Sequence, residues 1–377
     1  MLRMLRTRRS RGIIIQAALL AAVGALVAGM VLTARENLIA QGIATGFGFL
    51  DRSTGWPINV APIEVSDRSS YARMLLAGLL NTLHVGITGL AGATLVGLVV
   101  GMMRVSGNLV LEILGTAFVE TFRNVPLILQ VIFWYAVLTH LPPPRGAIDL
   151  LGVGFLSNRG LMLPMPDWSG TDLLLIAAAL VAAVIAARRL GGERPLRAAA
   201  LALAAVAALA VLLLFLGHDP ARPLISLPQR QGLRFVGGLT VKPEFAALLT
   251  GIVIFGGAYV GEIVRAGFLS VDRGVLQAAR ALGLSGWQVY RLVHIPLAVR
   301  AMLPALANQY VWLMKATTLG VAIGYPDYFM VVSTAINQTG QTIELLLLLM
   351  GGFLVINYTL GGAMNWLNAR LAIRGRN

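Results

Sequence analysis

Residues 277–296 read QAARALGLSGWQVYRLVHIP, a polar, arginine-bearing stretch between two segments that are apolar enough to cross a membrane. Asp272 can cap a helix that begins near Arg273, and Gly283 can end that helix by adopting a positive φ. Pro296 suits the first turn of the helix that follows. The stretch therefore predicts a short helix and a turn that connect two spans outside the bilayer core.

The short helix predicted over residues 273–283 is amphipathic. Its apolar face carries Val275, Leu276, Ala279 and Leu282, and its polar face carries Arg273, Gln277 and Arg280. Ala278 and Ala279 have small side chains, so another protein could approach the backbone closely. A basic amphipathic helix that rests on the membrane surface would show the same pattern, and the pattern alone leaves both readings open.

The composition is that of an integral membrane protein. Of the 377 residues, 57% are hydrophobic and 12% are charged, whereas about 25% are charged in a typical soluble domain. The chain has no cysteine, which excludes disulfides, cysteine-ligated zinc and iron–sulfur clusters.

Eight stretches have about the 20 apolar residues that a bilayer core requires. They cover residues 13–34, 74–103, 109–139, 171–187, 198–216, 245–265, 298–324 and 343–367. An even number of spans places both termini on one side. We expect the first span to be an uncleaved anchor, because it is longer than the apolar core of a secretory signal.

The net charge of +14 follows the predicted topology. More than half of the 30 basic residues fall in the short segments on the side of the termini. The positive-inside rule makes that side cytoplasmic. Extracytoplasmic loops are then expected at 35–73, 141–170, 217–244 and 325–342. The charge reflects topology and contact with lipid headgroups, and it does not form a nucleic-acid-binding patch.

Known enzyme motifs are missing from the sequence. The four histidines show no H-E-x-x-H pattern and no metal-ligand spacing, and there is no G-x-S-x-G. The two lysines, Lys242 and Lys315, follow Val241 and Met314, so a G-x-x-x-x-G-K-[ST] phosphate loop is impossible. If ATP drives this protein, another subunit must bind the nucleotide.

The stretch at 277–296 resembles the cytoplasmic coupling loop of ABC importer permeases, which carries Glu-Ala-Ala, three residues and Gly, and ends near Ile and Pro. Here the matching residues are Gln277, Ala278, Ala279, Gly283, Ile295 and Pro296. The sequence departs from the pattern at Gln277, which replaces an acid, and in a compressed ending. Gln277 keeps the length and an acceptor oxygen of the usual acid but not its charge.

Further blocks resemble the polar amino-acid subclass of these permeases (the histidine and general L-amino-acid family). They are GLLNTLHVGITGL (78–90), ETFRNVPLILQ (120–130), GAYVGEIVRAG (257–267) and NQYVWLMKATTLGVAIG (308–324). Together they extend over most of 74–368 in the order of the family. The N-terminal extension and the extra hairpin at 171–216 resemble permeases of broad-range L-amino-acid importers.

The resemblance implies an all-α ABC type I importer permease with about eight transmembrane helices in the bacterial inner membrane. The partners it implies are a second permease subunit in a heterodimer, two ATPase subunits that hold ATP and Mg²⁺, and a periplasmic amino-acid-binding protein. An amino acid would be the substrate, and this chain itself would hold no cofactor or metal. The residues expected to contact the ATPase are Asp272, Arg273, Leu276, Gln277, Ala278, Ala279, Arg280, Leu282 and Gly283.

Ionisable residues at membrane depth mark candidates for the translocation path or the substrate site. Arg123 lies in the third span with Glu120 one turn earlier, and Pro126 is expected to kink or break that helix. Lys315 lies 15 residues beyond Arg300 and should reach the outer half of the membrane. The complete candidate set is Glu120, Arg123, Tyr259, Glu262, Lys315 and Thr317. Glu262 has a competing reading, because its side chain can turn toward Arg265.

The expected domain division has three parts. Residues 1–73 form a cytoplasmic tail, an anchor helix and a periplasmic loop, residues 74–368 form the permease domain, and residues 369–377 form a cytoplasmic tail. The alanine-rich hairpin at 171–216 is expected to be a peripheral insertion. Two alternatives remain, a polytopic lipid-modifying transferase and an ion-coupled secondary transporter. The first lacks a nucleophile-and-base pattern, and the second lacks mid-depth carboxylates and an inverted repeat.

Overall fold

The computed structural model describes residues 8–40, 46–166, 195–216, 223–232 and 234–371, together with residues 172, 175–176, 178–180, 182–183 and 185–186. The chain divides into two compact units, one formed by residues 1–120 and 256–377 and the other by residues 121–255. The long helix α7 (Pro243–Leu269) has its first half in the second unit and its second half in the first. The N-terminal residues 1–7 and most of the predicted C-terminal tail lie outside the described residues.

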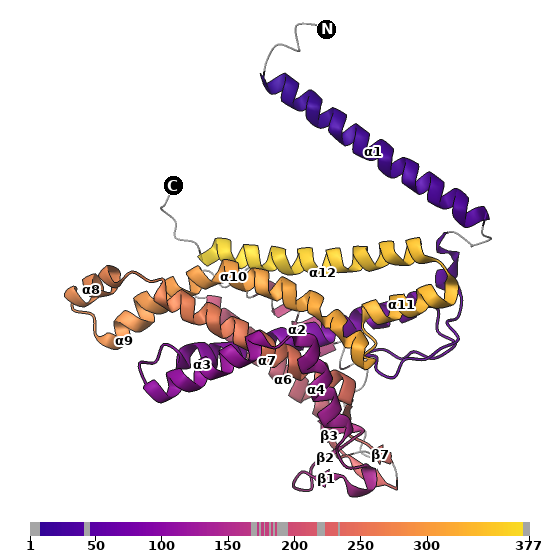
Figure 1. Cartoon of the computed structure of the whole chain (residues 1–377). Helices are drawn as coiled ribbons and strands as arrows, with labels where there is room; N and C mark the ends of the chain where they lie inside the picture. The colour runs from indigo at the N-terminus through magenta and orange to yellow at the C-terminus, as the bar shows by residue number, and fades with distance from the viewer. Residues whose placement is uncertain are drawn as a thin grey trace. The chain divides into compact units, whose positions relative to one another are not determined.

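The first unit is helical (Figure 1). Besides the second half of α7, it contains α1 (Arg8–Ala40), α2 (Tyr71–Met103), most of α3 (Leu109–Asn124), α8 (Arg273–Ala281), α9 (Gly286–Val289), α10 (Ile295–Ala316), α11 (Tyr328–Thr339) and α12 (Thr342–Leu371). Short helices of other types are η2 (Phe47–Asp51), the π-helical η4 (Tyr290–His294) and the 3₁₀-helical η5 (Thr317–Ile323). Helix α10 packs along α12, and α11 packs on α2.

Most predicted spans correspond to described helices. Five helices are long and apolar enough to cross a membrane, and α3 with α4 (Leu127–Thr139) makes a sixth if the bent pair is one span. These match the predictions over 13–34, 74–103, 109–139, 245–265, 298–324 and 343–367. The segment at 198–216 lies in a helix, α6 (Pro195–Leu216), and the span at 171–187 is only partly described. A helical, multi-pass membrane protein is confirmed, and the number eight stays a prediction.

Pro126 breaks the third span, as the sequence predicts. Helices α3 and α4 meet at a bend of 100° around it. Proline donates no backbone hydrogen bond, and the break frees carbonyl oxygens that find no water in a bilayer. The side-chain amide of Gln130 supplies donors, because its Nε2 lies 2.9 Å from the carbonyl oxygen of Phe122 and 3.0 Å from that of Val125. Gln130 therefore stabilises the broken helix.

Glycines allow α2 and α7 to pack closely within the first unit. A Cβ added at Gly97 would overlap Val260, and one added at Gly257 would lie 2.7 Å from Val96. Small residues of this kind allow membrane helices to approach closely.

Residues 325–342, expected to be a loop, form mainly the helix α11. The sequence YFMVVSTAINQT is too short to span a membrane, but one set of its side chains, Tyr328, Val331, Val332 and Ala335, is buried against α2, α12 and η2. This core consists of Phe49, Tyr71, Met74, Leu75, Tyr328, Val331, Val332, Ala335 and Leu345. A helix in this connection was not predicted from the sequence, and the extracytoplasmic position of the connection stays a prediction.

A buried polar network holds the residues before α11 on α2. The amide of Asn81 donates to the carbonyl oxygens of Val60 (2.7 Å) and Pro326 (2.8 Å), and the hydroxyl of Tyr325 donates to the carbonyl oxygen of Asn81 (3.0 Å). Asn81 is fully buried. One side chain therefore joins three segments that are far apart in the sequence.

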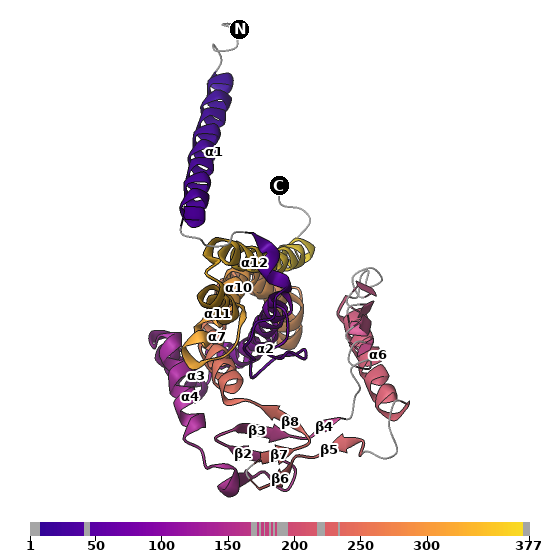
Figure 2. The same cartoon turned by 90° about the vertical axis from the view of Figure 1, so that its right-hand side faces the viewer.

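The second unit contains short strands (Figure 2). Strands β1 (Ile148–Asp149), β2 (Phe155–Ser157), β3 (Gly160–Leu163) and β8 (Leu239–Val241) form an antiparallel sheet in that order, and η3 (Pro144–Gly146) precedes it. Strand β4 (Met165–Pro166) pairs with β5 (Ile225–Ser226), and β6 (Gln229–Gln231) pairs with β7 (Arg234–Val236). The helix-only prediction missed these strands in the loops 141–170 and 217–244. The β3–β8 pairing joins the chain on either side of the hairpin insertion.

The described part of the hairpin 171–216 presents alkyl side chains. Ala179, Ala182, Ala183 and Ala186 line a shared cavity with Ala202, Ala205, Val206 and Leu209 of α6. The charged connection between its arms, residues 187–194, lies outside the described residues. Its peripheral position stays a prediction.

Candidate functional site

The polar stretch between α7 and α10 forms two short helices, each with a side-chain cap at its start. The carboxylate of Asp272 accepts a hydrogen bond from the backbone N–H of Gly274 at 2.5 Å, which confirms the predicted cap of α8. The hydroxyl of Ser285 and the side chain of Gln288 form a reciprocal capping box at α9. These bonds give both helices defined ends although neither helix is long.

Gly283 ends α8 in the predicted left-handed conformation, with φ 82°. Its N–H donates to the carbonyl oxygen of Arg280 (2.9 Å), and the N–H of Leu284 donates to that of Ala279 (3.3 Å). This pair of bonds is a Schellman motif. A Cβ at Gly283 would meet nothing within 4 Å, so the glycine is required by its backbone angle and not by crowding within the chain.

The apolar face of α8 packs only partly on its own chain. Ala279 is 5% exposed, whereas Val275 is 45% and Leu282 is 83% exposed. Leu276 is half-buried, and Arg273, Gln277, Ala278 and Arg280 are exposed. Of the four apolar residues predicted to share one face of this helix, only Ala279 is buried. Both apolar and cationic side chains of α8 remain open to a partner.

An aromatic cluster that the sequence reading missed connects this loop to the spans. Phe268 at the end of α7 stacks on Tyr290 of η4, with ring centroids 6.0 Å apart, and meets the edge of His294 at 5.0 Å. The His294 Nε2 lies 3.0 Å from the carbonyl oxygen of Phe268. Trp287 of α9 stacks on Tyr290 at 6.1 Å. The scattered aromatic residues gave no sequence periodicity that would have predicted this contact.

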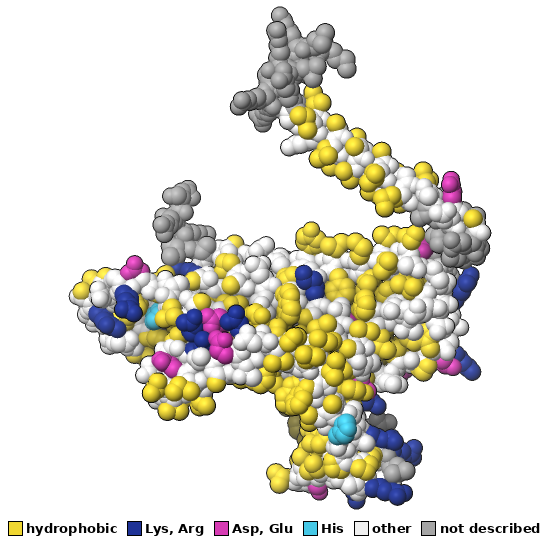
Figure 3. All heavy atoms as spheres, in the orientation of Figure 1, with side chains coloured by type: hydrophobic (Ala, Val, Ile, Leu, Met, Phe, Trp, Pro, Cys, Tyr) yellow, Lys and Arg dark blue, Asp and Glu magenta, His cyan; other side chains and the backbone are white. Residues whose placement is uncertain are grey.

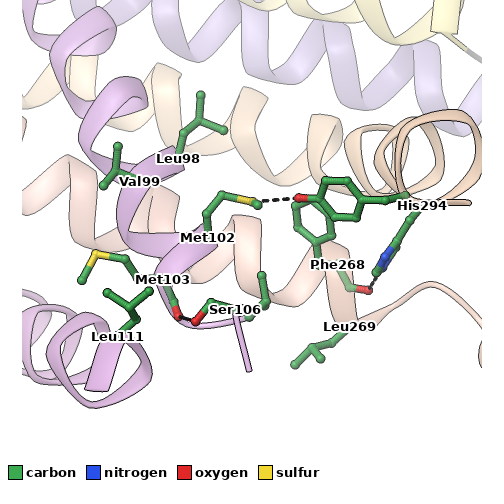
Figure 4. Close-up of a pocket in the computed structure, with 11 residues that line it drawn as sticks. Leu98, Val99, Met102, Met103, Ser106, Leu111, Phe268, Leu269 and His294 are labelled. Atoms are coloured by element: carbon green, nitrogen blue, oxygen red, sulfur yellow. Dashed lines mark hydrogen bonds between the residues drawn. The ribbon is translucent and has the colours of Figure 1, made fainter. Parts of the chain in front are cut away.

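The cluster borders an apolar cavity of about 770 Å³, shown in Figure 4. Met102 and Met103 at the end of α2 lie on one side of it, and Phe268 and His294 lie on the other. The hydroxyl of Tyr290 approaches the sulfur of Met102 at 3.6 Å. The cavity places the ends of two spans next to the loop that carries α8.

Glu262, a predicted path residue, lies in an ion cluster. Its carboxylate pairs with Arg104 at the end of α2, and it also pairs with Arg265 at 2.6 Å. The Arg104 side chain is 8% exposed, and its Nε donates to the hydroxyl of Thr116 at 3.3 Å. The competing reading, in which Glu262 turns toward Arg265, is confirmed. Figure 3 shows acidic side chains flanked by basic ones on the mostly apolar helical surface.

The other path candidates lie on four elements, α3, α7, α10 and η5. Glu120 and Arg123 are one turn apart on α3, and their pairing stays a prediction. Tyr259 is half-buried on α7. Thr317 is fully buried at the start of η5, where its hydroxyl donates to the carbonyl oxygen of Met314 at 2.9 Å. Thr317 thus has a structural hydrogen bond.

Lys315 is exposed on α10. A charged side chain at the centre of a membrane helix costs about 2.5–3.5 kcal/mol when it faces lipid. Trp312 and Asn308 are exposed on the same face, one and two turns earlier. A polar stripe on a membrane-spanning helix indicates a face that contacts water or protein. Within the described residues, no group of three or more potential metal ligands accompanies it.

Comparison with known proteins agrees with this geometry. Residues 93–373 match the family described as "Binding-protein-dependent transport system inner membrane component". The chain is 38% identical to the putative amino-acid ABC transporter permease protein YhdX of Escherichia coli K12, over 89% of this chain and 88% of that protein. It is 36% identical to the general L-amino acid transport system permease protein AapQ of Rhizobium johnstonii, over 89% and 86%. It is 30% identical to the glutamate/glutamine/aspartate/asparagine transport system permease protein BztB of Rhodobacter capsulatus, over 98% and 95%. The chain therefore belongs to the family of inner membrane components of binding-protein-dependent transport systems.

Proposed function

We propose that the chain is the membrane permease subunit of an ATP-driven importer of L-amino acids, in which α8 contacts the ATPase. The family match and the extent of the three relatives support the permease role, and the names of those relatives support the substrate class. A separate ATPase chain would hold ATP and Mg²⁺, because this sequence has no phosphate-binding loop. The transferase and ion-driven alternatives have no comparable support.

The observation that carries the ATPase contact is the shape of α8. A short helix with defined ends leaves Val275, Leu282, Arg273 and Arg280 exposed. Such a helix can insert into a groove with little loss of conformational freedom. The same face would also suit a membrane surface, but the stacking of η4 on Phe268 ties the loop to α7. A helix tied to a span can transmit movement, and a helix that only rests on lipid has no need of that connection.

The assembly would contain further chains. The family works with a binding protein, as its description states, and an ATPase follows from the transport mechanism. We propose a second, different permease chain as the membrane partner, with both termini of this chain in the cytoplasm. The predicted positive charge of the cytoplasmic segments supports this orientation. Arg123, Glu120, Tyr259, Thr317 and Lys315 are proposed to line or border the path, whereas Glu262 is proposed to stabilise the inner end of the bundle.

Purification from native membranes tests the proposal. A tagged chain should bring down an ATPase and a second permease, and the reconstituted complex should hydrolyse ATP faster when an amino acid and its binding protein are added. An isolated chain with no ATPase partner, or an ATPase indifferent to every amino acid, would refute the proposed function.

A further inference from the structure

Lys315 lines a cavity of about 520 Å³ between α10 and α12. Its other lining residues are Val311, Met350, Phe353, Leu354, Asn357 and Tyr358. All of them belong to the first unit, and apart from Lys315 none was a candidate from the sequence. Most of the wall is therefore apolar, with one cation, one carboxamide and one phenol. Binding sites for small molecules commonly combine apolar walls with a few placed polar groups.

The depth of the cavity follows from the two helices. Asn357 is 15 residues from the first residue of the 30-residue helix α12, so it lies near the middle of that helix. Lys315 is the last residue but one of α10. The cavity thus lies within the span of α12 and away from both of its ends. A lysine at such a position needs an anionic partner or water.

Asn357, which lines the same cavity as Lys315, has an unused acceptor. Its Nδ2 donates to the carbonyl oxygen of Phe353 at 2.7 Å, while its Oδ1 is buried and accepts no hydrogen bond. A buried acceptor without a donor is costly. A rotation of the carboxamide toward the cavity would expose this acceptor to a ligand that supplies an N–H.

The two groups complement an α-amino acid. A free amino acid carries a carboxylate and an ammonium group on one carbon, and it needs a cation for the first and an acceptor for the second. We propose that Lys315 and Asn357 form a zwitterion site, in which the ammonium of Lys315 pairs with the substrate carboxylate and the Oδ1 of Asn357 accepts from the substrate ammonium. The site would recognise the part that all amino acids share, and the apolar wall would leave the side chain free to vary.

This inference rests on the proposed function, and direct binding to the assembled complex separates the two. The complex is reconstituted in lipid nanodiscs without the binding protein. The probes are L-glutamine, 4-aminobutanamide and glutaramic acid. The second is L-glutamine without its carboxylate, and the third is L-glutamine without its ammonium. Both truncated probes should bind at least about tenfold more weakly than L-glutamine, because each leaves one charge-assisted bond unmade.

Variants assign each loss to a residue. Lys315→Met should weaken L-glutamine binding by about tenfold or more and remove the preference for L-glutamine over 4-aminobutanamide. Lys315→Arg should retain that preference. Asn357→Leu should remove the preference for L-glutamine over glutaramic acid. Lys242→Met, at the only other lysine and exposed outside α7, is the matched control and should retain both preferences.

The outcomes are distinct. Equal binding of L-glutamine and 4-aminobutanamide by the unaltered complex would overturn the inference even if Lys315→Met fails to assemble. Equal binding together with loss of the second permease from the Lys315→Met complex would assign Lys315 to a subunit contact. Absence of binding by the unaltered complex, while cells import L-glutamine through it, would also overturn the zwitterion site and leave the proposed function standing.

Discussion

Gly283 holds a φ of 82° in open space, so its role can be tested separately from crowding within the chain. Gly283→Ala should destabilise the end of α8 by about 1 kcal/mol, because a Cβ disfavours positive φ. Gly283→Leu adds bulk on the side that faces the proposed ATPase. Both variants should insert normally, and the leucine variant should lose amino-acid-stimulated ATP hydrolysis by the reconstituted complex.

Gly286 provides the matched control for this prediction. It lies in the same loop at the start of α9, has open space around it and lacks a positive φ. Gly286→Ala should therefore leave stimulation nearly unchanged. Normal stimulation with Gly283→Leu would contradict the assignment of α8 as the ATPase contact.

Asp327 is a second residue whose role can be tested, through the dependence of stability on pH. Its Oδ1 accepts from the backbone N–H of Met330 at 2.8 Å, and burial raises its pKa to about 7. A pKa above the unfolded value of about 4 favours the protonated form in the folded state, so this contribution to stability is complete below about pH 4 and is lost as the pH rises through about 7. Thermal denaturation in detergent should show a melting temperature that falls as the pH rises from about 4 to about 7 and that levels off above about pH 7.

Asp327→Asn should remove this slope, because asparagine retains the cap of α11 without a titrating carboxyl. Asp272→Asn alters an exposed cap aspartate and should leave the slope in place. Parallel slopes for the unaltered protein and Asp327→Asn would assign the pH dependence to another group.

At the scale of elements, the Arg104–Glu262–Arg265 cluster joins α2 to α7. Arg104→Gln should cost about 1.5–3 kcal/mol, because it removes a charge-assisted bond from a largely buried position. Arg265→Gln should cost less, since the Arg265 side chain is 33% exposed and one turn from Glu262 on the same helix. Chemical denaturation of the two variants in one detergent compares them directly. An equal loss of stability in the two variants, or a larger loss for Arg265→Gln, would show that the Arg104–Glu262 pair between helices adds no stability beyond the Glu262–Arg265 pair.

The elements also show what the sequence could reveal. The caps of α8 and the break at Pro126 were predictable, because Asp272, Gly283 and Pro126 act on their own neighbours in the chain. The Arg104–Glu262 pair was not, because its partners are 158 positions apart. The strands β1 to β8 are two to four residues long, too short for alternation to appear, and their pairing depends on tertiary contacts.

At the scale of the whole molecule, the orientation of the chain in the membrane can be measured by labelling. The absence of native cysteine makes single-cysteine labelling clean. Ser53→Cys should react with an impermeant reagent added from the periplasm, and Ser285→Cys should react only after the membrane is opened, because positive charge favours a cytoplasmic α8 loop. The reverse pattern would place α8 on the side without ATP and contradict the ATPase contact.

The protein family could also be predicted from local blocks of sequence. The coupling pattern at 277–283 and the block at 308–324 placed the chain among importer permeases, and the family match over 93–373 confirms it. The cavity between α10 and α12 was hidden, because Lys315 and Asn357 are 42 positions apart and meet only when the helices pack. Such a site depends on tertiary structure and has no signature in either helix alone.

The cluster of Phe268, Tyr290 and His294 has a consequence for how a movement of α8 would pass through the chain. A flexible connection between α8 and the spans would not transmit small displacements of α8. Closely packed side chains transmit displacement, so if the ATPase moves α8 as proposed, the movement should reach the end of α7 and the start of α10 together. The loop would then act as a rigid connection that is attached to both α7 and α10. These two spans should therefore move together in each transport cycle.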